Sequence, residues 1–202
     1  MVLTTAFCWS KFGIEAGESE RSILARKDAE RVANGGAFLW GIGSSIRPSL
    51  IDLLATTDRP EVLFTPMLSR PSPRDTEPAA VGAWRSATGL DGRPYRLPEH
   101  TLVTSGSATS TPSRDHFALV CRSDAPIPDD TRVEWLDDTT LRNLRTGSRV
   151  GSSQVTAVVA SVVAQPPSRP RYRVAFRARL QAPYLVTLGD WVPLPKAVIR
   201  AS

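Results

Sequence analysis

The clearest pattern of apolar positions lies between residues 37 and 67. Residues 37–40 are predicted to form a strand, and G-I-G-S-S follows as a turn. Leu50, Leu53 and Leu54 then recur at the spacing of an amphipathic helix, which D-R-P should end at residues 58–60. Residues 62–65 return to a strand pattern before Pro66. This stretch therefore predicts a strand, a helix and a second strand, around which the rest of the chain is organised.

A strand and a helix are predicted ahead of this stretch. Residues 2–9 are rich in apolar and β-branched side chains and are expected to be the first strand, which leads into C-W-S-K-F. Ser19 is the expected N-cap of a helix with Ile23, Leu24 and Val32 on its inner face. The run N-G-G at residues 34–36 should end that helix.

The remaining chain predicts mostly strands. Residues 69–79 contain three prolines and are expected to be a surface loop. Residues 133–144 include a short helix capped by Asp138 or Thr139 and carrying Leu141 and Leu144. Strands are predicted at residues 81–86, 95–97, 101–105, 116–122, 155–163, 184–188 and 191–194. About nine strands and three helices indicate an α+β fold, a small mixed β-barrel with inserted helices.

Arginine alternates with apolar residues after the proline-rich tract at residues 166–170. Arg171, Arg173, Arg177 and Arg179 alternate with apolar side chains between residues 172 and 180. That pattern is typical of a half-exposed strand with its charges outward. Two interpretations stay open: the arginines contact phosphates, or they protect an edge strand against aggregation.

The composition indicates a single globular domain of 202 residues, because 41% of them are hydrophobic and 22% are charged. No basic segment precedes an apolar run at the start, so we expect no signal peptide. The most apolar stretch, residues 155–164, is far shorter than the roughly 20 residues that cross a bilayer. Cys8 and Cys121 both lie in strand-like runs, which favours reduced core thiols in a cytoplasmic protein.

The charge permits a nucleic-acid partner. The net charge is +5, and all but three of the 25 basic residues are arginine, whose planar fork suits phosphates and base edges. From residue 166 to the end, the sequence contains seven basic residues and a single acidic one, Asp190. We therefore expect phosphate contacts from arginines on loops and outer strands. The candidates are Arg70, Arg74, Arg171, Arg173 and Arg177.

The order of elements resembles the PUA-like superfamily, and within it the EVE and YTH readers of modified bases. The resemblance rests on F-C-W-S-K-F-G-I-E-A-G-E-S, F-L-W-G-I-G-S-S, E-V-L-F-T-P-M-L and S-S-Q-V-T-A-V, in that order over residues 2–164. It implies one PUA-like domain over residues 1–202, in which residues 166–202 form a basic C-terminal β extension. The proline-rich loop and the arginine-rich strands depart from the family's minimal pattern.

Readers of this kind hold a flipped base between aromatic faces and short polar groups. Carried onto this chain, the resemblance makes Trp40 one wall of a pocket, although a Trp at that place could equally be a core side chain. Trp84, Trp135 and Trp191 are expected to pack in the core or at edges. The candidate pocket residues are Trp9, Ser10, Phe12, Trp40, Gly41, Gly43, Ser44, Ser45 and Met67.

The expected function is a non-enzymatic binding module that recognises a methylated base in DNA, with 5-methylcytosine as the first expectation. Neither His100 nor His116 has the spacing of a metal ligand, and no phosphate loop or nucleophile elbow occurs. We expect no cofactor, no metal and no membrane partner. The alternatives are an RNA-modification reader, a small-molecule or protein-interaction barrel, and a nucleic-acid-processing enzyme or regulatory subunit built on Asp115, His116 and Asp129.

Overall fold

A computed structural model describes residues 5–14, 18–43, 51, 54, 60–68, 81–97, 103–104, 116–150, 156–161 and 172–193, and the statements below concern these residues. They include eleven strands and the helix α1, and residues 51 and 54 are helical as well. The elements are β1 (Thr5–Phe12), α1 (Glu20–Ala33), β2 (Ala37–Gly43), β3 (Glu61–Pro66), β4 (Val81–Gly89), β5 (Val103–Thr104), β6 (His116–Arg122), β7 (Trp135–Leu136), β8 (Leu141–Asn143), β9 (Thr156–Ser161), β10 (Tyr172–Arg173) and β11 (Phe176–Pro193).

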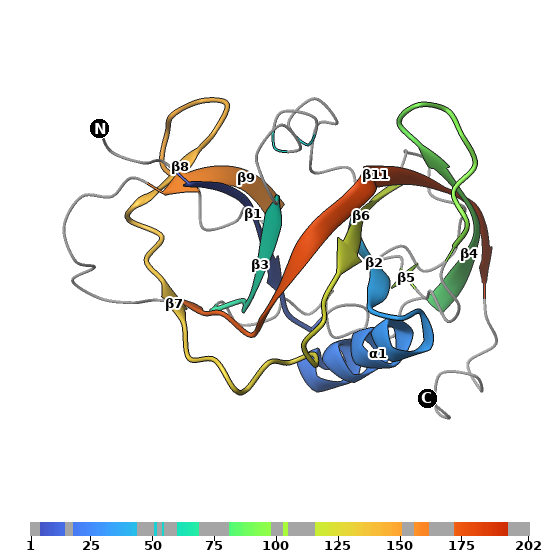
Figure 1. Ribbon diagram of the computed structural model, residues 1–202, viewed down its shortest axis with the longest axis horizontal. Helices are drawn as coiled ribbons and strands as arrows, with labels where there is room; N and C mark the ends of the chain where they lie inside the picture. Colours follow the sequence, from blue (N-terminus) through green and yellow to red (C-terminus); the bar gives the residue numbers. More distant parts are fainter. Residues whose placement is uncertain are drawn as a thin grey trace.

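Nine of the strands form one mixed sheet in the order β2-β6-β11-β3-β1-β9-β8, with β4 added to β11 and β5 added to β4. β1 and β3 are parallel, and the other pairs are antiparallel. β7 and β10 form a separate two-stranded sheet. Figure 1 shows β11 crossing the middle of the curved main sheet, with α1 lying against β2. The α+β prediction is therefore confirmed.

The described strands do not close into a barrel, so that part of the prediction is wrong. Closure would need the two end strands of the sheet, β2 and β8, to pair. Instead, the outer edge of β2 faces α1, where two buried side chains bind the backbone of Leu39: the Lys27 ammonium donates to its carbonyl (2.6 Å), and Glu30 accepts from its N–H (2.8 Å). At Leu39 the backbone groups on this edge are therefore already bonded, and α1 covers the edge in place of another strand.

The helix α1 begins and ends where the sequence predicts. The Ser19 hydroxyl accepts a hydrogen bond from the Ser22 N–H (3.2 Å), as an N-cap does, and Gly35 follows the last turn with a φ of +59°. Ile23 is buried, as expected, but Val32 is 63% exposed. The buried stripe runs through Ile23, Lys27 and Glu30 instead, because the two charged side chains reach β2.

The predicted helix at Asp138 or Thr139 is absent. Residues 137–140 form a turn, in which the Asp137 carboxylate accepts from the N–H (2.9 Å) and hydroxyl (2.6 Å) of Thr139. Leu141 then enters β8, which pairs with β9. Aspartate and threonine side chains bind nearby backbone groups in turns as readily as at helix N-termini. The residues that predict a helix cap here therefore form a turn instead.

β11 is a central strand, although the sequence placed it in a C-terminal extension. It pairs with β3 and β6 and, further along, with β6 and β4. Phe176, Ala178 and Leu180 are buried, so the predicted alternation of apolar and basic residues is confirmed. Protection of an edge strand does not explain Arg177 and Arg179, because both lie on this central strand.

Both cysteines are free and buried, as predicted for core thiols. Burial raises the pKa of Cys8 to about 12 and raises that of Cys121 as well. The predicted helix after Gly43 lies mostly outside the described residues. Of its segment, Ile51 and Leu54 are described, and both are helical and fully buried.

Candidate functional site

Trp40 lies in the main core. Only 6% of its surface is exposed, and its ring contacts those of Phe12, Phe64 and Phe176 at centroid distances of 5.9, 4.6 and 5.8 Å. A base could stack on the indole only after one of these rings moved away. This placement favours the packing role of Trp40 that the sequence left open.

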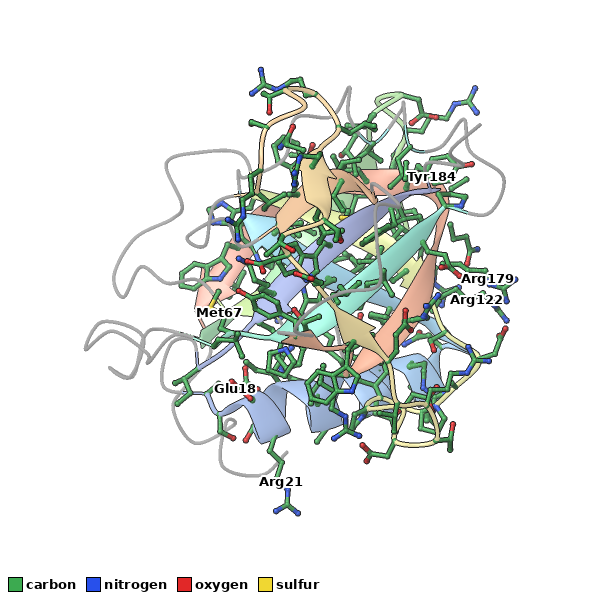
Figure 2. The ribbon with its side chains drawn as sticks, turned by 90° about the vertical axis from the view of Figure 1, so that its left-hand side faces the viewer. Glu18, Arg21, Met67, Arg122, Arg179 and Tyr184 are labelled. Carbon is green, nitrogen blue, oxygen red and sulfur yellow. The ribbon has the colours of Figure 1, made fainter. Side chains whose placement is uncertain are left out.

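Phe12 and Met67 come together at the ends of the parallel strands β1 and β3. The Met67 N–H donates to the Phe12 carbonyl (2.7 Å), and a Cβ added to Gly13 would lie 3.4 Å from the Met67 sulfur. Met67 is partly buried at this end of the sheet (Figure 2). Its position beside Phe12 agrees with the predicted grouping of these two residues.

Two further candidates lie on β2, at the end of the strand. Gly41 pairs with Ala118, and Gly43 has a φ of +57° that favours glycine. Open space surrounds Gly43, since an added Cβ would meet nothing within 4 Å. Ser44 and Ser45 lie outside the described residues.

Trp9 and Ser10 point to opposite faces of β1. Trp9 is 2% exposed; its indole N–H donates to the Thr65 hydroxyl (2.9 Å), and its ring meets Tyr172 edge to face at 5.0 Å. The Ser10 hydroxyl is buried on the other face against that of Thr156 (3.1 Å). The predicted pocket is therefore divided: Phe12 and Trp40 share one face, and Trp9 lies on the other.

Lys11 joins Trp9 on its face of the sheet. Its side chain is only 4% exposed, and its ammonium nitrogen lies 4.8 Å from the Trp9 ring centroid and 5.9 Å from that of Tyr172. Burial lowers the pKa of Lys11, and the charge of Asp138 partly opposes that shift. An ammonium group held between two aromatic rings is stabilised by their quadrupoles even where water is excluded.

Asp138 connects this cluster to a basic hairpin. Asp138 is 6% exposed, and its carboxylate lies 3.9 Å from the Arg149 guanidinium. The turn between β8 and Arg149 is ordered by the Asn143 side chain, which accepts from the N–H groups of Arg145 (3.0 Å) and Thr146 (3.2 Å). A buried ammonium, a buried carboxylate and two aromatic rings thus lie next to a surface hairpin that carries arginines.

Sequence reasoning missed Lys11, Tyr172 and Asp138. A signal for Lys11 was present, because residues two apart on a strand share a face and Trp9 was already a candidate. No comparable signal existed for Asp138 or Tyr172, which are brought in by the turn at residues 137–140 and by the β7–β10 pairing. We call Trp9, Lys11, Tyr172 and Asp138 the lysine–aromatic cluster.

The predicted phosphate contacts on β10 and β11 are engaged with acidic side chains. Arg177 binds Glu134 through two hydrogen bonds and Glu61 through a third (3.0 Å). Burial tends to lower the pKa of Arg177, but these two carboxylates outweigh it and raise the pKa overall. Arg173 lies 3.4 Å from Asp130. These pairs join the strands to the segment before β7, which favours a structural role.

Arg179 and Arg122 share a third carboxylate. They are cross-strand partners on β11 and β6, and Asp124 lies 2.5 Å from Arg179 and 3.7 Å from Arg122. Figure 2 shows both arginines at one edge of the molecule, on the opposite side from Met67. Arg70, Arg74 and Arg171 lie outside the described residues.

Four exposed arginines carry no ion pair within the part of the chain that the structure describes. All are exposed, and they lie on α1, on β4, in the segment after β4 and in the hairpin after β8. They are Arg21, Arg85, Arg96 and Arg145. Of these, Arg145 is on the hairpin that reaches the lysine–aromatic cluster through Arg149.

The groups suggested for a catalytic alternative are not brought together. His116 pairs with Leu188 near one end of β11, whereas the Asp129 N–H binds the carbonyl of Ala175 just before the other end. The Asp129 carboxylate accepts from the Thr131 hydroxyl (2.5 Å). Asp115 lies outside the described residues. Within the described ranges, no group of three or more histidine, cysteine or acidic side chains has the arrangement of a metal site.

Comparison of the chain with protein-family models, with curated proteins and with solved structures gives no match. No helix in the described part of the chain is long and apolar enough to cross a membrane.

Proposed function

We propose that this chain is a binding module for nucleic acid that takes a single modified base into the lysine–aromatic cluster. DNA carrying 5-methylcytosine is the first substrate to test. The observation that carries the proposal is the Lys11 ammonium, 4% exposed beside the rings of Trp9 and Tyr172 and near Asp138. Burial lowers the pKa of Lys11, and ionisable side chains perturbed in this way gather at functional sites.

The chemistry of the cluster complements the edge of cytosine. Its Watson–Crick edge presents one amino donor beside two acceptors. A carboxylate such as that of Asp138 accepts from the amino group, and an ammonium such as that of Lys11 donates to the ring nitrogen or the carbonyl. The rings of Trp9 and Tyr172 supply stacking surface, which is worth about 1–3 kcal/mol per base.

Uptake of a base requires movement in the cluster. Trp9 is 2% exposed, and the Lys11 ammonium lies over its ring, so the lysine side chain must leave the ring face as the base enters. The ammonium then exchanges a ring contact for hydrogen bonds to the base. Arg145 and Arg149, on the hairpin next to Asp138, are the proposed phosphate contacts.

The order of the elements supports the resemblance to PUA-like readers that the sequence suggests. A strand with the W-S-K motif is followed by a helix, by a strand that contains Trp40, and by a strand parallel to the first. The open sheet differs from the barrel of that superfamily, and β11 at its centre is a further difference.

A binding panel tests the proposal directly. Duplex and single-stranded DNA and RNA oligonucleotides of one sequence, with cytosine or 5-methylcytosine and with adenine or N6-methyladenine, are titrated at one salt concentration. We expect tighter binding to one modified oligonucleotide than to its unmodified twin. Equal affinity for every member of the panel, or no binding to any, would overturn the proposal.

A further inference from the structure

Two indole N–H groups are buried without a hydrogen-bond partner in the described part of the chain. They belong to Trp84 on β4 and Trp191 on β11. Buried N–H donors are nearly always satisfied, and the chain follows that rule at Trp9, which donates to Thr65. Two exceptions at one place need an explanation.

The two tryptophans lie directly opposite each other. β4 and β11 are antiparallel, and Trp84 and Trp191 are cross-strand partners, so their side chains share a face. Trp84 belongs to the core cluster that contains Leu39, and Trp191 packs against the same cluster. The two donors therefore come from neighbouring strands of one sheet face.

His116 adds a third ring to this place. It begins β6, which lies on the other side of β11 from β4, and its ring centroid is 5.2 Å from that of Trp84. Three adjacent strands thus each contribute one nitrogen-bearing ring. We call Trp84, Trp191 and His116 the indole–histidine cluster.

The backbone beside Trp191 is strained. Asp190 has a φ of +52°, a conformation that costs energy for residues other than glycine. The preceding Gly189 allows a close approach to β4, because a Cβ there would lie 2.6 Å from the Ser86 hydroxyl. Strained backbone of this kind gathers at binding sites, and here it directly precedes Trp191.

We infer that the indole–histidine cluster binds an oxyanion, a carboxylate or a phosphate group, through the indole N–H groups of Trp84 and Trp191. An oxyanion presents at least two acceptor oxygens, as two donors on paired residues of neighbouring strands require. Hydrogen bonds to a charged acceptor are also the stronger kind, and the net charge of +5 favours an anion. The indole–histidine cluster belongs to other strands and another core cluster than the lysine–aromatic cluster, so the inference does not depend on the proposed function.

Indole N–H signals in a nitrogen-15 NMR spectrum test this on the unmodified protein. The chain has five tryptophans, and single Trp→Phe variants assign their signals. Inorganic phosphate and acetate are titrated separately at constant ionic strength against chloride. We expect saturable shifts of the Trp84 and Trp191 signals with at least one of the two anions, and no shift for Trp9 or Trp135. The anion that acts distinguishes a phosphate from a carboxylate ligand.

Variants that keep a ring but lose the donor give the second measurement. Trp84→Phe and Trp191→Phe should each weaken binding of the active anion about tenfold or more, the effect of losing one hydrogen bond to a charged acceptor. Trp135→Phe, on the separate two-stranded sheet, is the matched control and should leave binding unchanged. The inference is overturned if neither anion shifts the two signals, if all five signals move together, or if the Trp84→Phe/Trp191→Phe double variant binds like the unmodified protein.

Discussion

Lys27 and Glu30 form a buried ion pair one turn apart on α1, and both bind the backbone of the same residue on β2. The ammonium lies 2.7 Å from the Glu30 carboxylate, and the side chains are 4% and 0% exposed. Together they satisfy the N–H and the carbonyl of Leu39 on the outer edge of the sheet. Burial lowers the pKa of Lys27, and Glu30 opposes that shift. The pair therefore takes the place of a neighbouring strand.

Removal of one partner of this pair should destabilise the fold strongly. We expect Glu30→Gln to lower the free energy of unfolding by about 3–5 kcal/mol, because it leaves the Lys27 charge buried without its counter-ion. Urea unfolding measures the change. Asp124→Asn, in exposed ion pairs with Arg122 and Arg179, is the control and should cost about 1 kcal/mol or less.

An apolar replacement of the whole pair should not restore stability. Many buried ion pairs can be exchanged for hydrophobic residues without loss. Here a Lys27→Met/Glu30→Leu variant would leave both backbone groups of Leu39 unpaired, so we expect it to remain well below the unmodified protein. Equal or greater stability of this variant would contradict the role assigned to the pair.

Trp40 supplies a test of packing against binding. We expect Trp40→Ala to lower the free energy of unfolding by about 3–5 kcal/mol, since its ring packs against three others in the core. Trp135→Ala, at a half-exposed residue, should lower the free energy of unfolding far less. Circular dichroism melting measures both. A Trp40→Ala variant that is as stable as the unmodified protein but no longer prefers a modified base would return Trp40 to the site.

The local part of the fold was predictable from the sequence. The N-cap at Ser19, the buried strand at residues 116–122 and the alternation along residues 172–180 depend on residues close together in the chain. The central place of β11 was not predictable, because the pairing of a strand depends on partners far away in sequence. The W-S-K motif contains Trp9 and Lys11, but their neighbours Tyr172 and Asp138 come from distant segments.

The buried thiol of Cys8 predicts a loss of stability in alkali. Its pKa is about 12 in the folded chain and about 9 when unfolded, so above pH 9 the unfolded chain loses a proton that the folded chain keeps. That difference favours unfolding as the pH rises. We expect the unmodified protein to lose about 1 kcal/mol relative to Cys8→Ala between pH 9 and pH 10, measured by urea unfolding under reducing conditions. A pH-independent difference between the two proteins would contradict the burial of a neutral thiol.

The arginines should differ in their effect on the salt dependence of binding. Arg145→Ala removes a proposed phosphate contact and should flatten the slope of log affinity against log salt concentration by about one unit. Arg177→Ala should leave that slope unchanged and lower the melting temperature, because Arg177 is held by Glu134 and Glu61. Titrations at four salt concentrations separate the two. The reverse result would place the phosphates along β11.

The central claim is that the Lys11 ammonium reads a modified base. Its most direct test is the ratio of affinities for the preferred modified oligonucleotide and its unmodified twin, measured for the unmodified protein, for Lys11→Met and for Arg21→Met. Arg21→Met removes one charge from an exposed residue of α1 that points away from the sheet (Figure 2). We predict that Lys11→Met lowers the ratio about 10- to 100-fold, the effect of about 1–3 kcal/mol of lost base contact, because the unmodified twin is bound through its phosphates alone and has no base contact to lose; Arg21→Met should leave the ratio unchanged. A folded Lys11→Met variant that keeps the full ratio would contradict the account.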